Sequence, residues 1–113
     1  MRRFALLLIG SLALPGAANP ADGAEPKGKE VFEHYCSHCH GPGDAPGTTQ
    51  LSRTRGKEKG LLSERTDLAP EYIEYTVRHG LRSMPPFVPS DLTDAKLKAL
   101  IGFLTKRETA GKK

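Results

Sequence analysis

The chain has 113 residues, which is enough for one small domain and leaves little room for two. Its 17 lysines and arginines against 13 acidic residues give a formal charge of +4, too little for a nucleic-acid-binding arm or a polybasic membrane patch. The two cysteines exclude a multi-disulfide scaffold, a four-cysteine zinc site and an all-cysteine iron–sulfur cluster. A domain this short and poor in apolar residues usually needs a disulfide, a metal or a cofactor to be stable.

Residues 1–18 have the three parts of a secretory signal peptide. A positive start is followed by an apolar run of eleven residues (4–14) and by small residues at 16–18. A run of eleven residues is only about half of the roughly 20 that a bilayer-spanning helix needs, so we expect cleavage and not a membrane anchor. The mature protein is therefore predicted to be periplasmic, to have no membrane span, and to begin with a flexible leader over residues 19–26.

Apolar spacing predicts a first helix over residues 28–39. Residues 41–60 are punctuated by glycine and proline and are predicted to form an irregular loop, whose basic side chains we interpret as solvated. A second helix is expected to begin at Pro70 and to end at Gly80. No segment has the alternating pattern of a strand, so the mature chain is predicted to be all-α, with three to four helices and long loops. The side chains predicted to face inward from the first two helices are Phe32, Tyr35, Cys36, Cys39, Ile73 and Val77.

The last helix has the clearest start signal. Thr93 is a suitable N-cap, and Leu92 and Leu97 can form a hydrophobic staple around it. The elements together predict one domain over residues 27–108, followed by a polar tail over residues 109–113. The inward stripe of the last helix is predicted to be Leu97, Leu100, Ile101 and Leu104.

The candidate chemistry lies in the sequence Cys36-Ser37-His38-Cys39-His40. Two cysteines at i and i+3 lie on one helical face, where their sulfur atoms can bond the two vinyl-derived carbons of one haem edge. His40 can then offer an imidazole nitrogen to the iron. This C-x-x-C-H pattern is typical of covalent haem attachment, and it occurs here together with an export signal and no further cysteine.

Three alternative uses of the cysteine pair remain open. A thioredoxin-like redox site needs a βαβ setting, and the sequence shows no strand. A disulfide between Cys36 and Cys39 would close a very small loop and add little stability. A zinc or copper site could recruit His34, His38 and His40, although the first two are better explained as solvent-facing spacers.

Met84 is the candidate for a second iron ligand. The chain has two methionines, and Met1 leaves with the predicted signal peptide. Met84 lies in a proline-stiffened loop 48 positions after Cys36, far enough for the chain to wrap to the opposite haem face. A thioether favours reduced iron, and ligation by histidine and methionine raises the reduction potential. The alternatives are that Met84 is a packing residue and that His79 is the ligand.

Four motifs follow residue 26: Gly28-x-x-x-Phe32, Cys36-Ser37-His38-Cys39-His40-Gly41, Arg82-Ser83-Met84-Pro85 and Leu100-x-x-Phe103. Together they resemble the motifs of class I c-type cytochromes. The resemblance implies a small all-α fold wrapped around one covalent haem c, with Phe32 and Phe103 packed where the first and last helices cross at Gly28. It also implies that a proline carbonyl accepts a hydrogen bond from the ligand imidazole, and Pro46 matches that proline better than Pro42.

Residues 69–87 are similar to the cytochrome subunits of flavocytochromes of the 4-cresol dehydrogenase (p-cresol methylhydroxylase) type, which oxidise para-alkylphenols. This resemblance implies an electron-transfer protein that is not itself an enzyme. It would accept electrons from a flavoprotein dehydrogenase subunit and pass them to a downstream cytochrome or oxidase acceptor of the respiratory chain. The alternatives are a free shuttle for another dehydrogenase or quinol-dependent complex, a haem enzyme with an open iron site, and a metal carrier.

The partner is expected to dock over the exposed haem edge, with residues 85–88 on or beside the contact. The rigid and apolar side chains of these residues would lose little conformational entropy when a partner binds. The alternative for Phe87 is that it covers the haem from inside. Arg78 and Arg82 could steer an acidic partner, but a charge near +2 after processing predicts only moderate salt dependence. No nucleic-acid partner is expected.

Overall fold

The computed structural model describes residues 25–106. The predicted signal peptide, nearly all of the predicted leader and the polar tail lie outside the described residues. Within the described range the chain forms five α-helices and two short 3-10 helices and has no strand, which confirms the all-α prediction. No helix in this range is long and apolar enough to cross a membrane. The elements are α1 (Gly28–Tyr35), α2 (Ser37–His40), α3 (Pro46–Arg55), η1 (Lys57–Lys59), η2 (Leu62–Glu64), α4 (Pro70–His79) and α5 (Asp94–Leu104).

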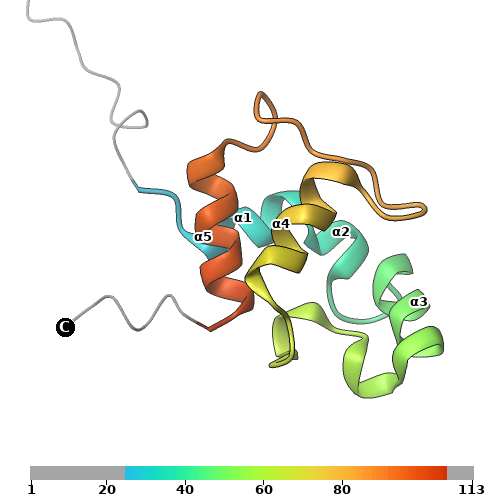
Figure 1. Cartoon of the computed structure of the whole chain (residues 1–113). Helices are drawn as coiled ribbons and strands as arrows, with labels where there is room; N and C mark the ends of the chain where they lie inside the picture. The colour runs from blue at the N-terminus through green and yellow to red at the C-terminus, as the bar shows by residue number, and fades with distance from the viewer. Residues whose placement is uncertain (1–24, 107–113) are drawn as a thin grey trace, which may run out of the picture.

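Helices α1 and α5 lie across one another, with α4 packed beside α5 (Figure 1). The rings of Phe32 and Phe103 meet at this crossing with 5.6 Å between their centroids, and Gly28 is buried at the start of α1. The crossing implied by the sequence resemblance is therefore confirmed. The buried apolar core consists of Val31, Phe32, Ile73, Val77, Leu92, Leu97, Leu100 and Leu104.

The predicted second and last helices are confirmed as α4 and α5. Thr93 caps α5, since its hydroxyl accepts a hydrogen bond from the backbone N–H of Lys96 at 3.3 Å. Leu92 and Leu97 are both buried on either side of this cap, as a hydrophobic staple requires.

The predicted single helix over residues 28–39 is wrong, because the chain forms two helices that break at Cys36. The backbone φ of Cys36 is −118°, away from regular helical values. The Ser37 hydroxyl donates a hydrogen bond to the Glu33 carbonyl at 2.6 Å, which satisfies a carbonyl near the end of α1.

The predicted irregular loop over residues 41–60 is also wrong, since it contains α3 and η1. Pro46 begins α3 at a position where proline is favoured, and Gly56 ends it with a φ of 106°. Leu51 is the one strongly apolar residue in α3, so the sequence has no amphipathic spacing that would predict this helix. A hydrogen bond from Thr48 instead joins α3 to the turn that precedes it, as described below.

Candidate functional site

The cysteine–histidine turn, residues 36–41, is closed by backbone hydrogen bonds. The Cys36 carbonyl accepts the N–H groups of Cys39 and His40 at 3.1 and 2.8 Å. The N–H of Gly41 donates to the Ser37 carbonyl at 2.7 Å, and a Cβ on Gly41 would lie 2.5 Å from that oxygen. Only glycine fits this close approach. The turn leaves both cysteines as free thiols, with Cys36 half-buried against the core and Cys39 exposed.

The two titratable groups of this turn are shifted by burial. Burial raises the pKa of the Cys36 thiol to about 11, and the nearby Cys39 adds to this rise. Burial lowers the pKa of His40, so its imidazole is neutral around neutral pH. A neutral imidazole carries a free lone pair and can bind a metal ion.

The His40 imidazole lies against the first turn of α3. A Cβ built on Gly47 would lie 2.7 Å from Cε1 and 2.9 Å from Nδ1 of the ring. Nδ1 is buried and has no hydrogen-bond partner among the described residues. The bond predicted from His40 to the carbonyl of Pro46 is therefore not formed in this structure, although Pro46 directly precedes Gly47. Nδ1 lies on the α3 side of the ring, so Nε2 is the nitrogen that remains for a metal ion.

A buried hydrogen bond holds α3 against this turn. The Thr48 hydroxyl is buried and donates to the Gly41 carbonyl at 2.7 Å. The Ser52 hydroxyl in turn donates to the Thr48 carbonyl at 2.8 Å. Sequence reasoning missed the roles of Gly47 and Thr48, whose one sequence signal is that they follow the proline singled out for the imidazole.

The second half of the site is the Met84 segment, residues 80–87. Leu81 and Met84 exchange two backbone hydrogen bonds of 3.0 Å each. Gly80 has a φ of 75°, and a Cβ there would lie 2.6 Å from the Met84 carbonyl oxygen. The N–H of Phe87 then donates to the Val77 carbonyl at 2.8 Å. The segment thus leaves the end of α4 and returns to it, with Met84 half-buried against the core.

The remaining residues of the predicted docking loop divide into two groups. Pro85, Pro86 and Val88 are exposed, as expected of a contact surface. Phe87 is half-buried, and its ring meets that of Tyr35 edge-on with 6.2 Å between centroids. Phe87 therefore packs inward against Tyr35 and is not part of the exposed contact surface.

The two arginines proposed to steer a partner also differ. The Arg78 side chain is 16% exposed, and its guanidinium is bonded to the chain between α4 and α5. It is therefore a structural residue, and the steering role assigned to it is wrong. Arg82 is exposed and remains available for that role.

The other histidines are not arranged as metal ligands. His79 is exposed, its ring stacks on Tyr75 with 4.2 Å between centroids, and its Nδ1 lies 2.9 Å from the Tyr75 carbonyl oxygen. His34 and His38 are exposed, as predicted for spacers. Residues 25–106 hold no group of three histidine, cysteine or acidic side chains that could bind a metal ion.

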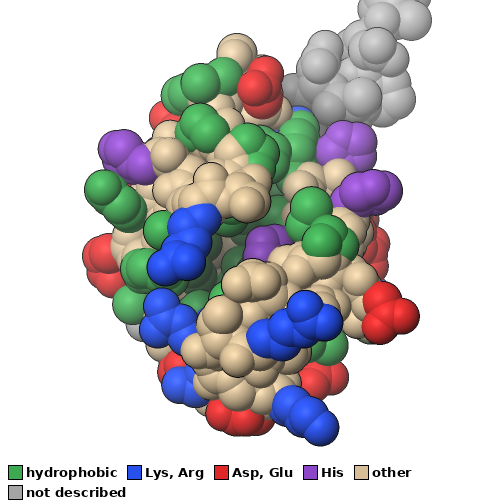
Figure 2. Space-filling view, turned by 90° about the vertical axis from the view of Figure 1, so that its right-hand side faces the viewer, with side chains coloured by type: hydrophobic (Ala, Val, Ile, Leu, Met, Phe, Trp, Pro, Cys, Tyr) green, Lys and Arg blue, Asp and Glu red, His purple; other side chains and the backbone are tan. Residues whose placement is uncertain are grey.

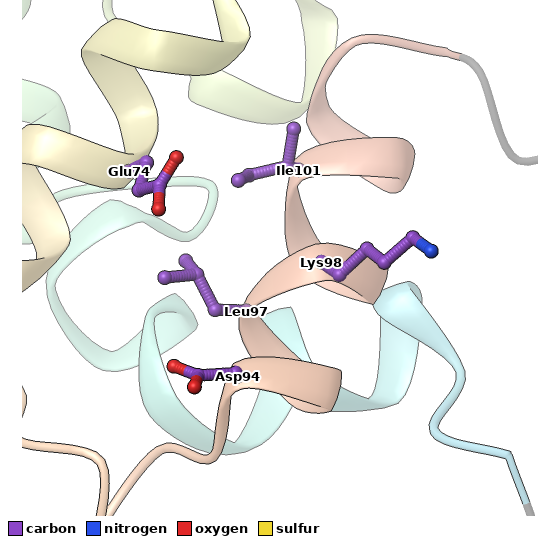
Figure 3. Close-up of a pocket in the computed structure, with 5 residues that line it drawn as sticks. All are labelled: Glu74, Asp94, Leu97, Lys98 and Ile101. Atoms are coloured by element: carbon purple, nitrogen blue, oxygen red, sulfur yellow. The ribbon is translucent and has the colours of Figure 1, made fainter.

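α2, α3 and the Met84 segment lie on the right-hand side of the molecule in Figure 1, and Figure 2 looks onto this side. Hydrophobic side chains and a histidine lie in a hollow near the centre of this face, with lysine and arginine side chains to its left and below it (Figure 2). A separate pocket lies between α4 and α5, where Glu74 faces α5 and the Lys98 side chain points away (Figure 3). That pocket contains none of the predicted haem-binding residues. It is lined by Glu74, Asp94, Leu97, Lys98 and Ile101.

Comparison with known proteins identifies the family. The family model described as cytochrome c oxidase, cbb3-type, subunit III matches residues 23–104. The chain belongs to the class I c-type cytochromes. This cytochrome is 31% identical over 100 residues to the cytochrome c subunit of 4-cresol dehydrogenase (hydroxylating) from Pseudomonas putida, and the match covers 88% of this chain and 76% of that protein. No solved structure matches the chain.

Membership of this family confirms electron transfer as the class of function, in place of catalysis by the chain itself. The family implies haem c, and the residues of the site fit that group. Two free thiols lie at the attachment spacing, and an imidazole with an orphaned nitrogen lies beside them. A half-buried thioether is available from the Met84 segment.

Gly47→Ala tests whether the first turn of α3 sets the position of the His40 ring. The new methyl group would overlap the ring and the Cys39 carbonyl oxygen, so we expect a destabilisation of about 1–3 kcal/mol together with a lower haem content per polypeptide. Gly43→Ala is the control, because its Cβ would meet nothing within 4 Å and would strain only the backbone at a φ of 79°. Equal haem content in the two variants would contradict the assignment.

Proposed function

We propose that this cytochrome is a periplasmic electron carrier with one covalently bound haem c. Each thiol, of Cys36 and of Cys39, adds across one vinyl group of the porphyrin, so that two thioethers form and no atom is lost. His40 and Met84 are the proposed iron ligands. The observation that carries this proposal is the half-buried imidazole of His40, packed against Gly47 beside the two free thiols.

The haem supplies a one-electron iron couple, and the chain tunes and protects it. The His40 ring is held between the cysteine–histidine turn and α3, so it can change its position little when the iron changes charge. The Met84 thioether favours the reduced state of iron and raises the potential. Apolar neighbours around Cys36 and Met84 limit the access of water.

We further propose that a flavoprotein dehydrogenase donates the electron and that a downstream cytochrome or oxidase accepts it. The similarity to a 4-cresol dehydrogenase subunit supports a partner of the type that oxidises para-alkylphenols. Pro85, Pro86 and Val88 offer an exposed, apolar and largely rigid contact beside Met84. The described residues place one exposed arginine, Arg82, within the Met84 segment itself, so we expect moderate salt dependence.

Replacement of both thiols tests the covalent attachment. The wild-type polypeptide should keep its haem through acid–acetone extraction and should carry the mass of one haem. Cys36→Ala/Cys39→Ala should lose both properties. His38→Ala is the matched control, because it changes an exposed residue within the same motif and should keep the haem. Haem that is extractable from the wild type would refute the attachment.

Substitution of Met84 tests the second ligand. Met84→His should lower the midpoint potential on the order of 0.1 V, within the roughly 0.8 V range that axial ligands span. Met84→Ala should open the iron to cyanide, which a titration followed by absorption would detect. His79→Ala is the control and should leave the spectrum unchanged, since this histidine is exposed and stacked on Tyr75. If His79→Ala instead removes the low-spin spectrum, the ligand assignment is wrong.

Reduction by a partner tests the donor. Flavoprotein candidates encoded beside this cytochrome should co-purify with it when both are expressed together. Addition of a 4-alkylphenol should then reduce the haem, and Val88→Asp should slow this reduction because Val88 is 49% exposed beside the Met84 segment. Rapid reduction by a quinol-dependent complex, with no flavoprotein bound, would replace this reading with that of a free shuttle.

A further inference from the structure

Arg78 connects three parts of the chain around the Met84 segment. Its Nη1 donates to the carbonyl oxygens of Phe87 and Leu92 at 3.0 and 2.8 Å. Its Nη2 donates to the Asp94 carboxylate at 2.6 Å. One largely buried guanidinium therefore links the last turn of α4, the chain that follows Met84, and the first turn of α5.

The chain over residues 85–93 depends on such contacts, because it contains no helix or strand. Its backbone is also tied by the bond from Phe87 N–H to Val77, by two bonds to the Val88 carbonyl, and by the bond from Leu97 N–H to the Thr93 carbonyl. The Tyr35 hydroxyl adds one more, to the Asp91 carbonyl at 3.0 Å. Removal of the guanidinium would leave two partly buried carbonyl groups without this donor, which favours a conformation in which water reaches them.

We propose that Arg78 is a positioning residue that holds Met84 against the iron by keeping the Met84 segment closed. This inference rests on the proposed ligand role of Met84. The start of the segment is fixed by the bond from Gly80 N–H to the Thr76 carbonyl at 2.8 Å. The other end is fixed at Phe87, whose N–H bonds to α4 and whose carbonyl bonds to Arg78. Met84 lies between these two points, three residues before the Arg78 contact.

The bonds from Arg78 to the two carbonyl groups, and not its ion pair with Asp94, are the contacts that hold the Met84 segment closed. The Asp94 side chain is 89% exposed, and ion pairs with such exposed partners contribute little to stability. The two carbonyl groups are fixed backbone acceptors at different points of the chain. Both bonds come from Nη1, whose two hydrogens have fixed directions in the guanidinium plane. The ammonium of lysine lies on a flexible stem and has rotatable donors, so it does not hold the two carbonyl groups in the same fixed geometry.

Four forms of the oxidised haem protein test the proposal: wild type, Arg78→Lys, Arg82→Lys and Asp94→Asn. Each is titrated with imidazole, and binding is followed in the absorption spectrum together with the weak red band of sulfur–iron ligation. Imidazole must displace Met84 from the iron. A looser Met84 segment competes less well, so the iron then binds imidazole more tightly. Arg78→Lys should bind imidazole roughly tenfold more tightly and weaken the red band, as expected for the loss of a charge-assisted hydrogen bond.

Arg82→Lys and Asp94→Asn are the matched controls and should stay within about twofold of the wild type. Arg82 lies in the same segment but is exposed and has no bonded partner among the described residues. Arg78→Gln is a fifth form, in which we expect a larger effect than in Arg78→Lys. If circular dichroism shows that Arg78→Gln does not fold, Arg78→Lys decides the question.

The outcomes separate this inference from the proposed function. If Arg78→Lys lowers the thermal midpoint but binds imidazole as the wild type does, Arg78 is merely structural and the inference is overturned. If the wild type itself lacks the red band and binds imidazole as Met84→Ala does, the ligand assignment falls, and the inference falls with it. Tighter imidazole binding by Arg78→Lys alone supports both.

Discussion

Phe32 of α1 packs against Phe103 of α5 with 5.6 Å between the ring centroids, and both halves of the candidate site depend on this crossing. The cysteine–histidine turn follows α1 directly, so the direction of α1 sets where Cys36 and His40 lie. The Met84 segment is tied to the same core through α4 and through the chain that leads into α5. A core of few buried side chains therefore fixes two distant parts of the sequence relative to one another.

Close backbone approach is the second constraint on the site. At Gly41, Gly47 and Gly80 a Cβ would lie within 3 Å of a neighbouring atom. Gly41 closes the turn that holds His40, and Gly47 leaves space for the His40 ring. Gly80 allows the Met84 carbonyl oxygen to approach the backbone at the end of α4. Each of these glycines therefore lies beside one of the proposed iron ligands, and polar anchors such as Thr48 and Arg78 hold the surrounding chain in place.

The sequence predicted the elements whose signals are local. The Thr93 cap and the apolar spacing were sufficient to predict α4 and α5, because these signals depend only on residues close together in the sequence. The helix α3 could not be predicted, since the buried Thr48 hydroxyl holds it against a carbonyl seven residues away. The role of Arg78 was wrongly predicted to be the steering of an acidic partner, for a similar reason. Its partners are backbone carbonyl groups 9 and 14 residues along the chain, and a sequence does not show where carbonyl groups point.

Haem as the cofactor was predictable because the cysteine–histidine motif is compact and chemically specific, and the family comparison agrees with haem c. The measurement that tests the account most directly is a potentiometric titration of the purified wild-type protein, followed in the visible spectrum. We predict one single-electron transition of a polypeptide-bound haem that is low-spin in both oxidation states, with the sulfur–iron band in the oxidised form. A protein without haem, or a high-spin haem with an open iron position, would contradict the account.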